Sequence, residues 1–474
     1  MIIKKETTEY LPRRRVFLKL GGMALASTFV GGFAMPLKVR AAGKANPRRN
    51  ARYVLFIELP GAISPPDSWD FKETKETPKD FFPEKVFSEF YVSKTLFPNY
   101  DKWMTRASLV RSMRANELVH FPGQYHTQTG RNLNVAVAKE IPAFGSIIAS
   151  ELEKERRESD VLPTYVSFNL SRGRVGGVGS GFLPAQFSGL DLDTTSVFSS
   201  FAGDDEDEKG GSALDKRWQS RGRMEEVSPF NDAIGETVSE YKSFYEYARR
   251  ILNDSRWKKI FKVTEEEKKR YTNDFGISCL LARNVLAADA GARFIYINDC
   301  GAGGNGPWDH HTSIFDRRKN VNLYTTCNSI DRGIANLVQD LSTMPGKESG
   351  KTLLDETMII VTSEFGRTPV LNAAQGRDHY GACYTTIYLG AGVKQGRIIG
   401  KTDDTCTKTV DAGWKYKQRP AMDNTVATIY SALGIDWTKS IKNTPSGRDY
   451  DYVQTAPIGG SEFNAVDEIA ELFV

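Results

Sequence analysis

Short runs of consecutive apolar residues recur along the chain and predict buried β-strands. The first run spans Tyr53–Glu58 and is ended by Pro60 and Gly61, as expected of a strand that is covered on both faces. Segments with apolar residues every three to four positions, such as residues 143–155 and 233–290, predict helices between these runs. Buried strands that alternate with helices predict an α/β fold with a mostly parallel sheet. The other apolar runs span residues 107–113, 164–168, 292–297, 358–362 and 385–389.

A polar segment interrupts this alternation at residues 203–227. It begins with a run of aspartate and glutamate flanked by glycine, a composition that favours a solvent-exposed loop. Together with the helical pattern that follows, it predicts a helical insertion or cap at about residues 200–285. The α/β domain itself is expected to span residues 50–460.

Residues 1–42 have the pattern of an export signal. Arg13, Arg14 and Arg15 precede a weakly apolar stretch at residues 20–35, and small residues follow near residue 41. The pair Arg14 and Arg15 resembles a twin-arginine signal. A Sec signal or a membrane anchor is the alternative, but the apolar stretch is glycine-rich and too short to span a bilayer. We therefore expect export by the twin-arginine translocase to the periplasm or the medium, and no stable membrane span.

The charge of the chain is concentrated in this leader. Its eight basic residues stand against two acidic ones, whereas the whole chain has a net charge of +4. The mature chain is therefore slightly acidic, which argues against nucleic acid or an anionic membrane surface as its partner. The five cysteines show no C-x-x-C spacing, so neither a zinc knuckle nor a dense disulfide framework is indicated.

The five histidines of the chain fall into three short polar groups. The groups are His120 with His126, His310 with His311, and His379 alone. Carboxylates stand beside the imidazoles in both C-terminal groups. Histidine, aspartate and glutamate together are the ligands of divalent metal sites, so the sequence predicts a site that holds a divalent metal, zinc first and manganese next.

Several motifs, taken in order, resemble the domain of unknown function 1501 family. The most specific are E-F-G-R-T-P at residues 364–369 and G-R-D-H at residues 376–379, and the resemblance covers roughly residues 50 to 450. It implies an exported bacterial protein of the alkaline phosphatase and sulfatase fold group, with a three-layer α/β/α sandwich and metal ligands at the C-terminal ends of parallel strands. The remaining matched segments are residues 61–64, 67–70, 111–113, 129–130, 181–184, 279–283, 308–311 and 427–434.

The same resemblance suggests the metal ligands. Asp309 and His311 match the W-D-x-H block of the family, and His379 matches the G-R-D-H block. In an extended segment the side chains of residues 309 and 311 share one face while His310 points away. Glu364 stands just past a strand, where fold relatives place an acidic ligand, and Asp67 is an acidic ligand candidate after the first strand, as is Glu58.

Other residues are expected to act on a substrate. Ser64 lies where the fold group presents its nucleophile, but other members of the family place aspartate there, which favours a metal ligand over a covalent nucleophile. Arg367 and Arg377 could clamp an oxyanion or could brace the loops by pairing with Glu364 or Asp378. Residues expected around the metal or against a substrate are His120, His126 and Asp378.

Two functions remain open at this stage. The first is an exported, metal-dependent hydrolase of phosphate or sulfate esters that acts on a small anionic ester. The second is a non-catalytic exported protein that keeps the fold to bind or scaffold an unknown periplasmic partner. A hydrogen-bonded network without metal is the structural alternative for the whole set of residues.

Overall fold

A computed structural model of the chain describes residues 38–40, 45–195, 220, 254–300, 307–454, 457–459, 462–463 and 465–474. The arginine pair of the expected leader lies outside the described residues, as does most of the expected insertion apart from residue 220 and residues 254–285. No helix in the described part of the chain has the length and apolar character needed to cross a membrane.

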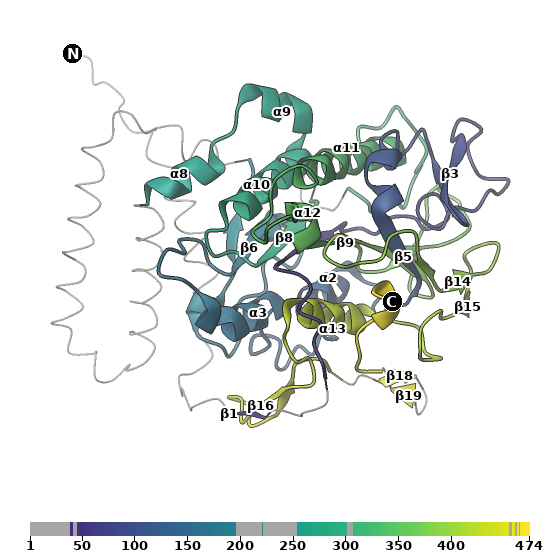
Figure 1. Cartoon of the computed structure of the whole chain (residues 1–474). Coiled ribbons are helices and arrows are strands. Elements are labelled where there is room, and N and C mark those ends of the chain that lie inside the picture. Colours follow the sequence, from purple (N-terminus) through teal and green to yellow (C-terminus); the bar gives the residue numbers. More distant parts are fainter. Residues whose placement is uncertain are drawn as a thin grey trace, which may run out of the picture.

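An eight-stranded sheet forms the centre of the protein (Figure 1). All neighbouring strands in it are parallel except that β12 runs antiparallel to both β5 and β9. The six predicted apolar runs form β2, β5, β6, β8, β9 and β12 within two residues of their predicted bounds, which confirms the predicted mostly parallel α/β sheet. In spatial order the strands are β13 (Ile398–Ile399), β5 (Ala107–Met113), β12 (Tyr384–Leu389), β9 (Thr357–Thr362), β2 (Tyr53–Glu58), β8 (Phe294–Asn298), β6 (Tyr165–Phe168) and β7 (Leu190–Leu192).

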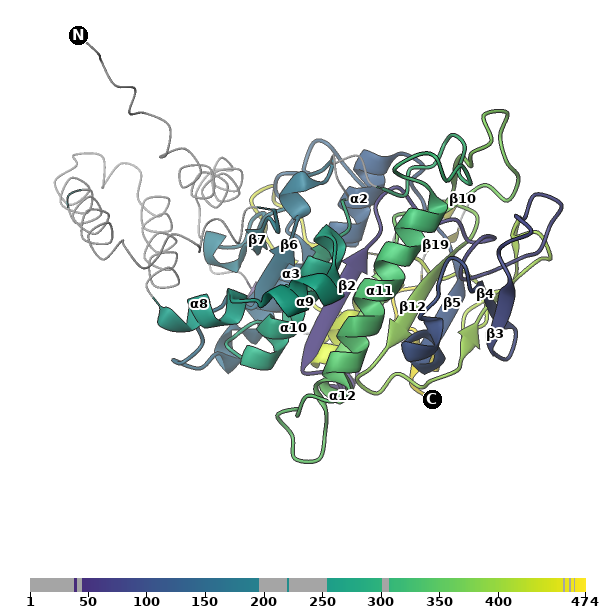
Figure 2. The same cartoon turned by 90° about the horizontal axis from the view of Figure 1, so that it is seen from above.

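Helices cover both faces of this sheet and make three layers (Figures 1 and 2). The alternate residues of β2 show how, since Leu55 and Ile57 pack into one apolar core and Val54 and Phe56 into the other. This is the reason for the continuous apolar run, because a strand buried on both faces has no polar side. The first core is closed by α8 (Ser255–Phe261), α9 (Glu265–Tyr271), α10 (Asp274–Ala288), α11 (Leu323–Leu341) and α12 (Leu353–Glu356), and the second by α3 (Phe144–Leu152) and α13 (Met422–Leu433).

The shorter elements lie around the sheet. The helix predicted from residue 143 is α3 followed by a 3-10 turn at Glu153–Glu155. Residues 38–40, at the end of the expected leader, form β1 and pair with β16. The remaining elements are α2 (His120–Thr129), β3 (Pro83–Phe87), β4 (Phe90–Ser93), β10 (Gly366–Arg367), β11 (His379–Tyr380), β14 (Lys401–Thr402), β15 (Thr409–Asp411), β16 (Ser440–Lys442), β17 (Tyr450–Asp451), β18 (Pro457–Gly459) and β19 (Glu462–Phe463).

Candidate metal centre

Polar groups from five segments meet at one edge of the sheet. The parallel strands β5, β2, β8 and β9 all end at this edge, and the chain continues from them to His120, Gly61, Asp309 and Glu364, respectively. His379 lies in β11, just before β12, and β12 runs antiparallel and therefore starts at the same edge. The topology thus brings residues that are far apart in the sequence to the C-terminal ends of parallel strands, where α/β proteins commonly hold their ligands.

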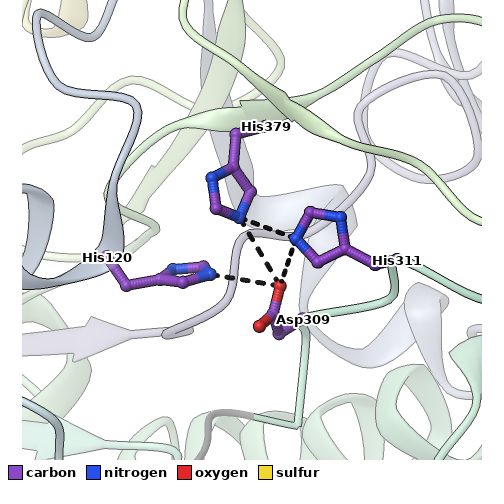
Figure 3. A group of neighbouring side chains, drawn as sticks. All are labelled: His120, Asp309, His311 and His379. Carbon is purple, nitrogen blue, oxygen red and sulfur yellow. Dashed lines mark hydrogen bonds and ion pairs between the residues drawn. The ribbon is translucent and has the colours of Figure 1, made fainter.

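Three imidazoles and one carboxylate converge there (Figure 3). The Asp309 Oδ1 atom lies 3.1 Å from His120 Nε2, 3.0 Å from His311 Nε2 and 3.6 Å from His379 Nε2. His311 Nε2 and His379 Nε2 are 2.9 Å apart. A tetrahedral zinc ion with nitrogen and oxygen ligands at its usual bond lengths holds those ligand atoms about 3.3 Å from one another. The four distances given above are close to this value, and all four atoms lie within 4.8 Å of one another, so the group could hold a metal ion.

The opposite nitrogen of each imidazole is held by an acceptor. His120 Nδ1 lies 2.7 Å from Glu364 Oε1, His311 Nδ1 lies 2.8 Å from Asp378 Oδ1, and His379 Nδ1 lies 2.6 Å from the carbonyl oxygen of Leu118. A carbonyl or a carboxylate can only accept, so Nδ1 carries the proton in each neutral ring and Nε2 presents a lone pair. Such outer partners fix the orientation of metal-binding histidines.

The charges around Asp309 keep it ionised. Burial opposes ionisation, but interactions with His120, His379 and Arg367 outweigh burial and hold the pKa of the Asp309 carboxyl well below its ordinary value. Burial also lowers the pKa of His120, yet Asp309 and Glu364 more than compensate, so this pKa is raised. His120 is buried, whereas the side chain of His311 is 40% exposed. Asp309 is thus ionised, and the group is open to solvent on the side of His311.

Two glycines allow the loops of this group to approach closely. A Cβ atom on Gly61 would lie 2.4 Å from Asp309 N, and the φ angle of Gly61 is 103°, which favours glycine. A Cβ atom on Gly376 would lie 2.0 Å from the carbonyl carbon of His311. The Gly61 amide also donates to Glu364 Oε1 over 2.8 Å. Side chains at these two positions would push the segments of Asp309 and His311 away.

Comparison with known proteins identifies the family. The family model "Protein of unknown function (DUF1501)" matches residues 51–458. The chain belongs to the DUF1501 family. No match to the chain was found among curated proteins.

Three solved structures are similar to this DUF1501 protein at low identity. A protein in the alkaline phosphatase superfamily from Vibrio parahaemolyticus is 11% identical with a TM-score of 0.36, over 89% of this chain and 76% of that chain. The PsFucS1 sulfatase from Pseudoalteromonas sp. is 10% identical with a TM-score of 0.35, over 90% and 72%. The lipoteichoic acid synthase LtaP from Listeria monocytogenes is 9% identical with a TM-score of 0.35, over 88% and 78%.

The two motif arginines of this DUF1501 chain are buried and held by other protein groups. Arg367 donates to Asp309 Oδ1 over 2.6 Å, to the Gly61 carbonyl and to the Arg377 carbonyl. Arg377 donates to both carboxylate oxygens of Asp67, over 2.7 and 3.0 Å, and to the Thr368 carbonyl. The structure places both side chains as braces between loops, with Asp309 and Asp67 as acidic partners instead of the expected Glu364 or Asp378.

Asp67 and Glu364, two expected ligands, lie outside the converging group. The Asp67 carboxylate accepts from Arg377 and from the Ser64 hydroxyl, the latter over 2.6 Å, and Ser64 is only 1% exposed. Glu364 lies behind His120, because its Oε1 atom accepts from His120 Nδ1 and from the Gly61 amide. Both carboxylates therefore orient other groups, and the Ser64 hydroxyl is directed at Asp67.

The remaining predicted residues divide between the site and the core. Asp378 holds His311, as an outer residue would. His126 lies 3.4 Å from Asp423 of α13 and is not part of the converging group. His310 is buried beside Arg367, and burial and that guanidinium lower the pKa of His310 to about 3.

His120 is expected around the metal or against a substrate, whereas the structure brings its Nε2 atom among the four converging atoms. Its position in the segment that follows a predicted parallel strand was a signal that could have identified it. No sequence signal marks the Leu118 carbonyl or Arg174, whose Nη2 atom lies 3.2 Å from Asp309 Oδ2.

Proposed function

We propose that the protein is an exported, metal-dependent hydrolase of phosphate or sulfate esters. The observation that carries this proposal is the convergence of three imidazole Nε2 lone pairs and Asp309 Oδ1 at ligand spacing, with each Nδ1 atom already bound to an acceptor. A purely structural cluster needs no such uniform orientation of its rings, whereas a metal site requires it.

The residues fit a divalent metal ion. His120, His311, His379 and Asp309 would hold it, and this nitrogen-rich set suits zinc first and manganese next. Such an ion, when bound, acts as a Lewis acid on an ester oxygen and lowers the pKa of a bound water toward neutrality. Asp309 supplies the negative charge of the set, and Arg367 holds its carboxylate in place. The partly exposed His311 and His379 leave a side by which a small anionic ester can enter.

The contacts of Ser64 bear on both candidate functions. The Ser64 hydroxyl is buried and donates to Asp67, whose carboxylate is neutralised by Arg377, so Asp67 is not free to act as its base. The proposed hydrolysis therefore proceeds by direct attack of water.

The second candidate is a protein in which Ser64, held in this way, marks a loss of hydrolysis. Such a chain would be a non-catalytic protein that uses the same metal centre to bind or scaffold a periplasmic partner.

Metal analysis combined with turnover separates these functions. The full-length protein would be purified, washed with chelator and reloaded, and its metal content determined by elemental analysis. One metal per chain with hydrolysis of an aryl phosphate or an aryl sulfate supports the hydrolase, and the same metal content without turnover supports the binding protein. Protein that takes up no metal would contradict both.

Export is part of the proposal and rests on the leader. The arginine pair and the small residues near residue 41 support passage through the twin-arginine translocase to the periplasm or the medium. That pathway carries folded proteins, which suits a chain whose metal ligands come together only after folding.

A further inference from the structure

Asp309 lies between two arginines that differ in their freedom to move. Arg367 contacts Oδ1, and its side chain is fully buried. Arg174 contacts Oδ2 over 3.2 Å, and its side chain is 38% exposed. A cation that is partly exposed and lies on the carboxylate of a metal-ligand group is in a position to meet an anion that enters from solvent.

The two buried arginines cannot take that role without breaking the loops. Arg367 donates to the carbonyls of Gly61 and Arg377, and Arg377 donates to Asp67 and to the carbonyls of Thr368 and Pro369. Turning either guanidinium toward a ligand would leave these buried acceptors without donors, which is costly. The sequence pattern pointed to these arginines, but their contacts commit them to the protein.

Arg174 is under no such constraint at Asp309. Ion pairs that are partly exposed contribute little to stability, so Asp309 can give up this guanidinium to a competing anion. The planar guanidinium matches two oxygens of a phosphate or sulfate group at once. The exchange also frees Asp309 Oδ2 while Oδ1 remains with Arg367 and the imidazoles.

The loop that carries Arg174 is attached to the elements that build the metal centre. Gln128 of α2 donates to the Gly176 carbonyl over 3.0 Å and accepts from the Val178 amide over 2.8 Å. On the other side of Arg174, a Cβ atom on Gly173 would lie 2.9 Å from the side chain of Asn298, which ends β8. Because α2 also provides His120 and β8 leads to Asp309, the same elements set the position of Arg174.

We infer that Arg174 binds the non-bridging oxygens of the tetrahedral oxyanion that enters the metal centre, and that it thereby selects anionic phosphate or sulfate esters over neutral ones. This inference rests on the proposed function. It also assigns the recognition of the anion to the loop at residues 173–178 instead of the two motif arginines.

The test measures binding of the anion, so it does not depend on turnover. Metal-loaded full-length protein would be titrated with inorganic phosphate and, separately, with inorganic sulfate by isothermal calorimetry. Wild type would be compared with Arg174→Ala, with Arg174→Lys and with the control Arg172→Ala, which removes an arginine just before this loop that pairs with Asp193 and Asp274. Metal content would be measured on every sample.

We expect Arg174→Ala to keep its metal and to bind the anion about 10-fold to 100-fold more weakly, as loss of a hydrogen-bonded charge pair implies. Arg174→Lys should recover part of the affinity, and Arg172→Ala should bind like wild type. The better-bound of the two anions identifies the ester class. Two outcomes would overturn the inference alone. In the first, wild type and Arg174→Ala hold full metal and bind the anion with equal affinity. In the second, wild type holds full metal but binds no anion. Absence of metal from wild type would overturn the proposed function and the inference with it.

Discussion

The Nε2 atoms of His311 and His379 face each other at 2.9 Å, while the Nδ1 atoms of both rings are bound to acceptors. Two neutral rings in this arrangement direct lone pairs at each other, and Arg367 Nη1 lies 3.4 Å from one of them, His311 Nε2. A cation between the rings would make the contact favourable. A proton can bridge only these two nitrogen atoms. A metal ion can bind both of them together with His120 and Asp309, whose ligand atoms lie within 4.8 Å of the others.

The first prediction concerns the ligands. His311→Ala and His379→Ala should each lose stoichiometric metal, because the remaining groups cannot replace the missing bond; the loss in affinity should exceed the ~10-fold to 100-fold effect of losing an outer partner. Elemental analysis of chelator-washed protein measures this. His310→Ala and His126→Ala are the controls, since both remove a buried imidazole outside the converging group. Equal metal content in all variants would assign the histidines to packing.

The second prediction concerns the outer partner of His311. Asp378→Asn should weaken metal binding about 10-fold to 100-fold, since an amide no longer fixes the proton on His311 Nδ1 as a carboxylate does. Competition with a chelator of known affinity measures the change. Asp316→Asn, which removes a partly exposed carboxylate paired with Arg318, should have no effect. An unchanged affinity in Asp378→Asn would mean that this carboxylate does not orient the ring.

The third prediction separates the roles of Asp67. Asp67→Asn should lower the free energy of unfolding by about 3–5 kcal/mol, because the buried Arg377 then loses its anionic partner, and it should leave the metal content unchanged. Ser64→Ala should cost only about 1 kcal/mol, the contribution of one hydrogen bond. Denaturant unfolding and elemental analysis measure the two properties. Loss of metal with little loss of stability would return Asp67 to the ligand set.

The fourth prediction concerns pH. Asp289 accepts hydrogen bonds from Tyr53, Arg52 and Arg157; burial opposes ionisation, but these donors outweigh it and lower the pKa of Asp289 below its ordinary value of 3.8. The ionised carboxylate therefore stabilises the fold above about pH 4, and this stabilisation is lost as the pH falls through the lowered pKa.

We expect Asp289→Asn to reduce the free energy of unfolding at pH 7 by about 1–3 kcal/mol, and the difference from wild type should shrink towards pH 3. Urea unfolding at the two pH values measures it. A difference that stays constant with pH would show that the ionised form of Asp289 is not favoured by folding.

The fifth prediction concerns export. Replacement of both Arg14 and Arg15 by lysine should leave the precursor in the cytoplasm, because the expected receptor distinguishes guanidinium groups from ammonium groups. Cell fractionation followed by immunoblotting measures the distribution. Replacement of Lys4 and Lys5 by arginine is the matched control and should change nothing. Processed protein in unchanged amount outside the cytoplasm would contradict a twin-arginine leader.

The strands were predictable because burial on both faces leaves a local signature. A continuous apolar run such as Tyr53–Glu58 is typical of a strand that is covered on both faces, and the six runs of this kind are the six longer strands of the central sheet. The shortest strands of the central sheet, β7 and β13, have three and two residues and leave no such signature. The reversed direction of β12 was also invisible, since an apolar run is the same read in either direction.

For the site, the sequence by itself determined which imidazoles, carboxylates and guanidinium groups were available. It also placed these groups after the ends of predicted strands. Only the tertiary structure decided which atoms meet, because the contacts join residues far apart in the chain: His120 reaches Glu364 across 244 positions, and Arg377 reaches Asp67 across 310. Local sequence specifies periodicity and polarity, whereas strand order and loop contacts determine which carboxylate receives an arginine and which remains beside the imidazoles. That difference separates Asp309, with its Oδ1 atom among three Nε2 atoms, from Asp67, which is held by Arg377 and Ser64.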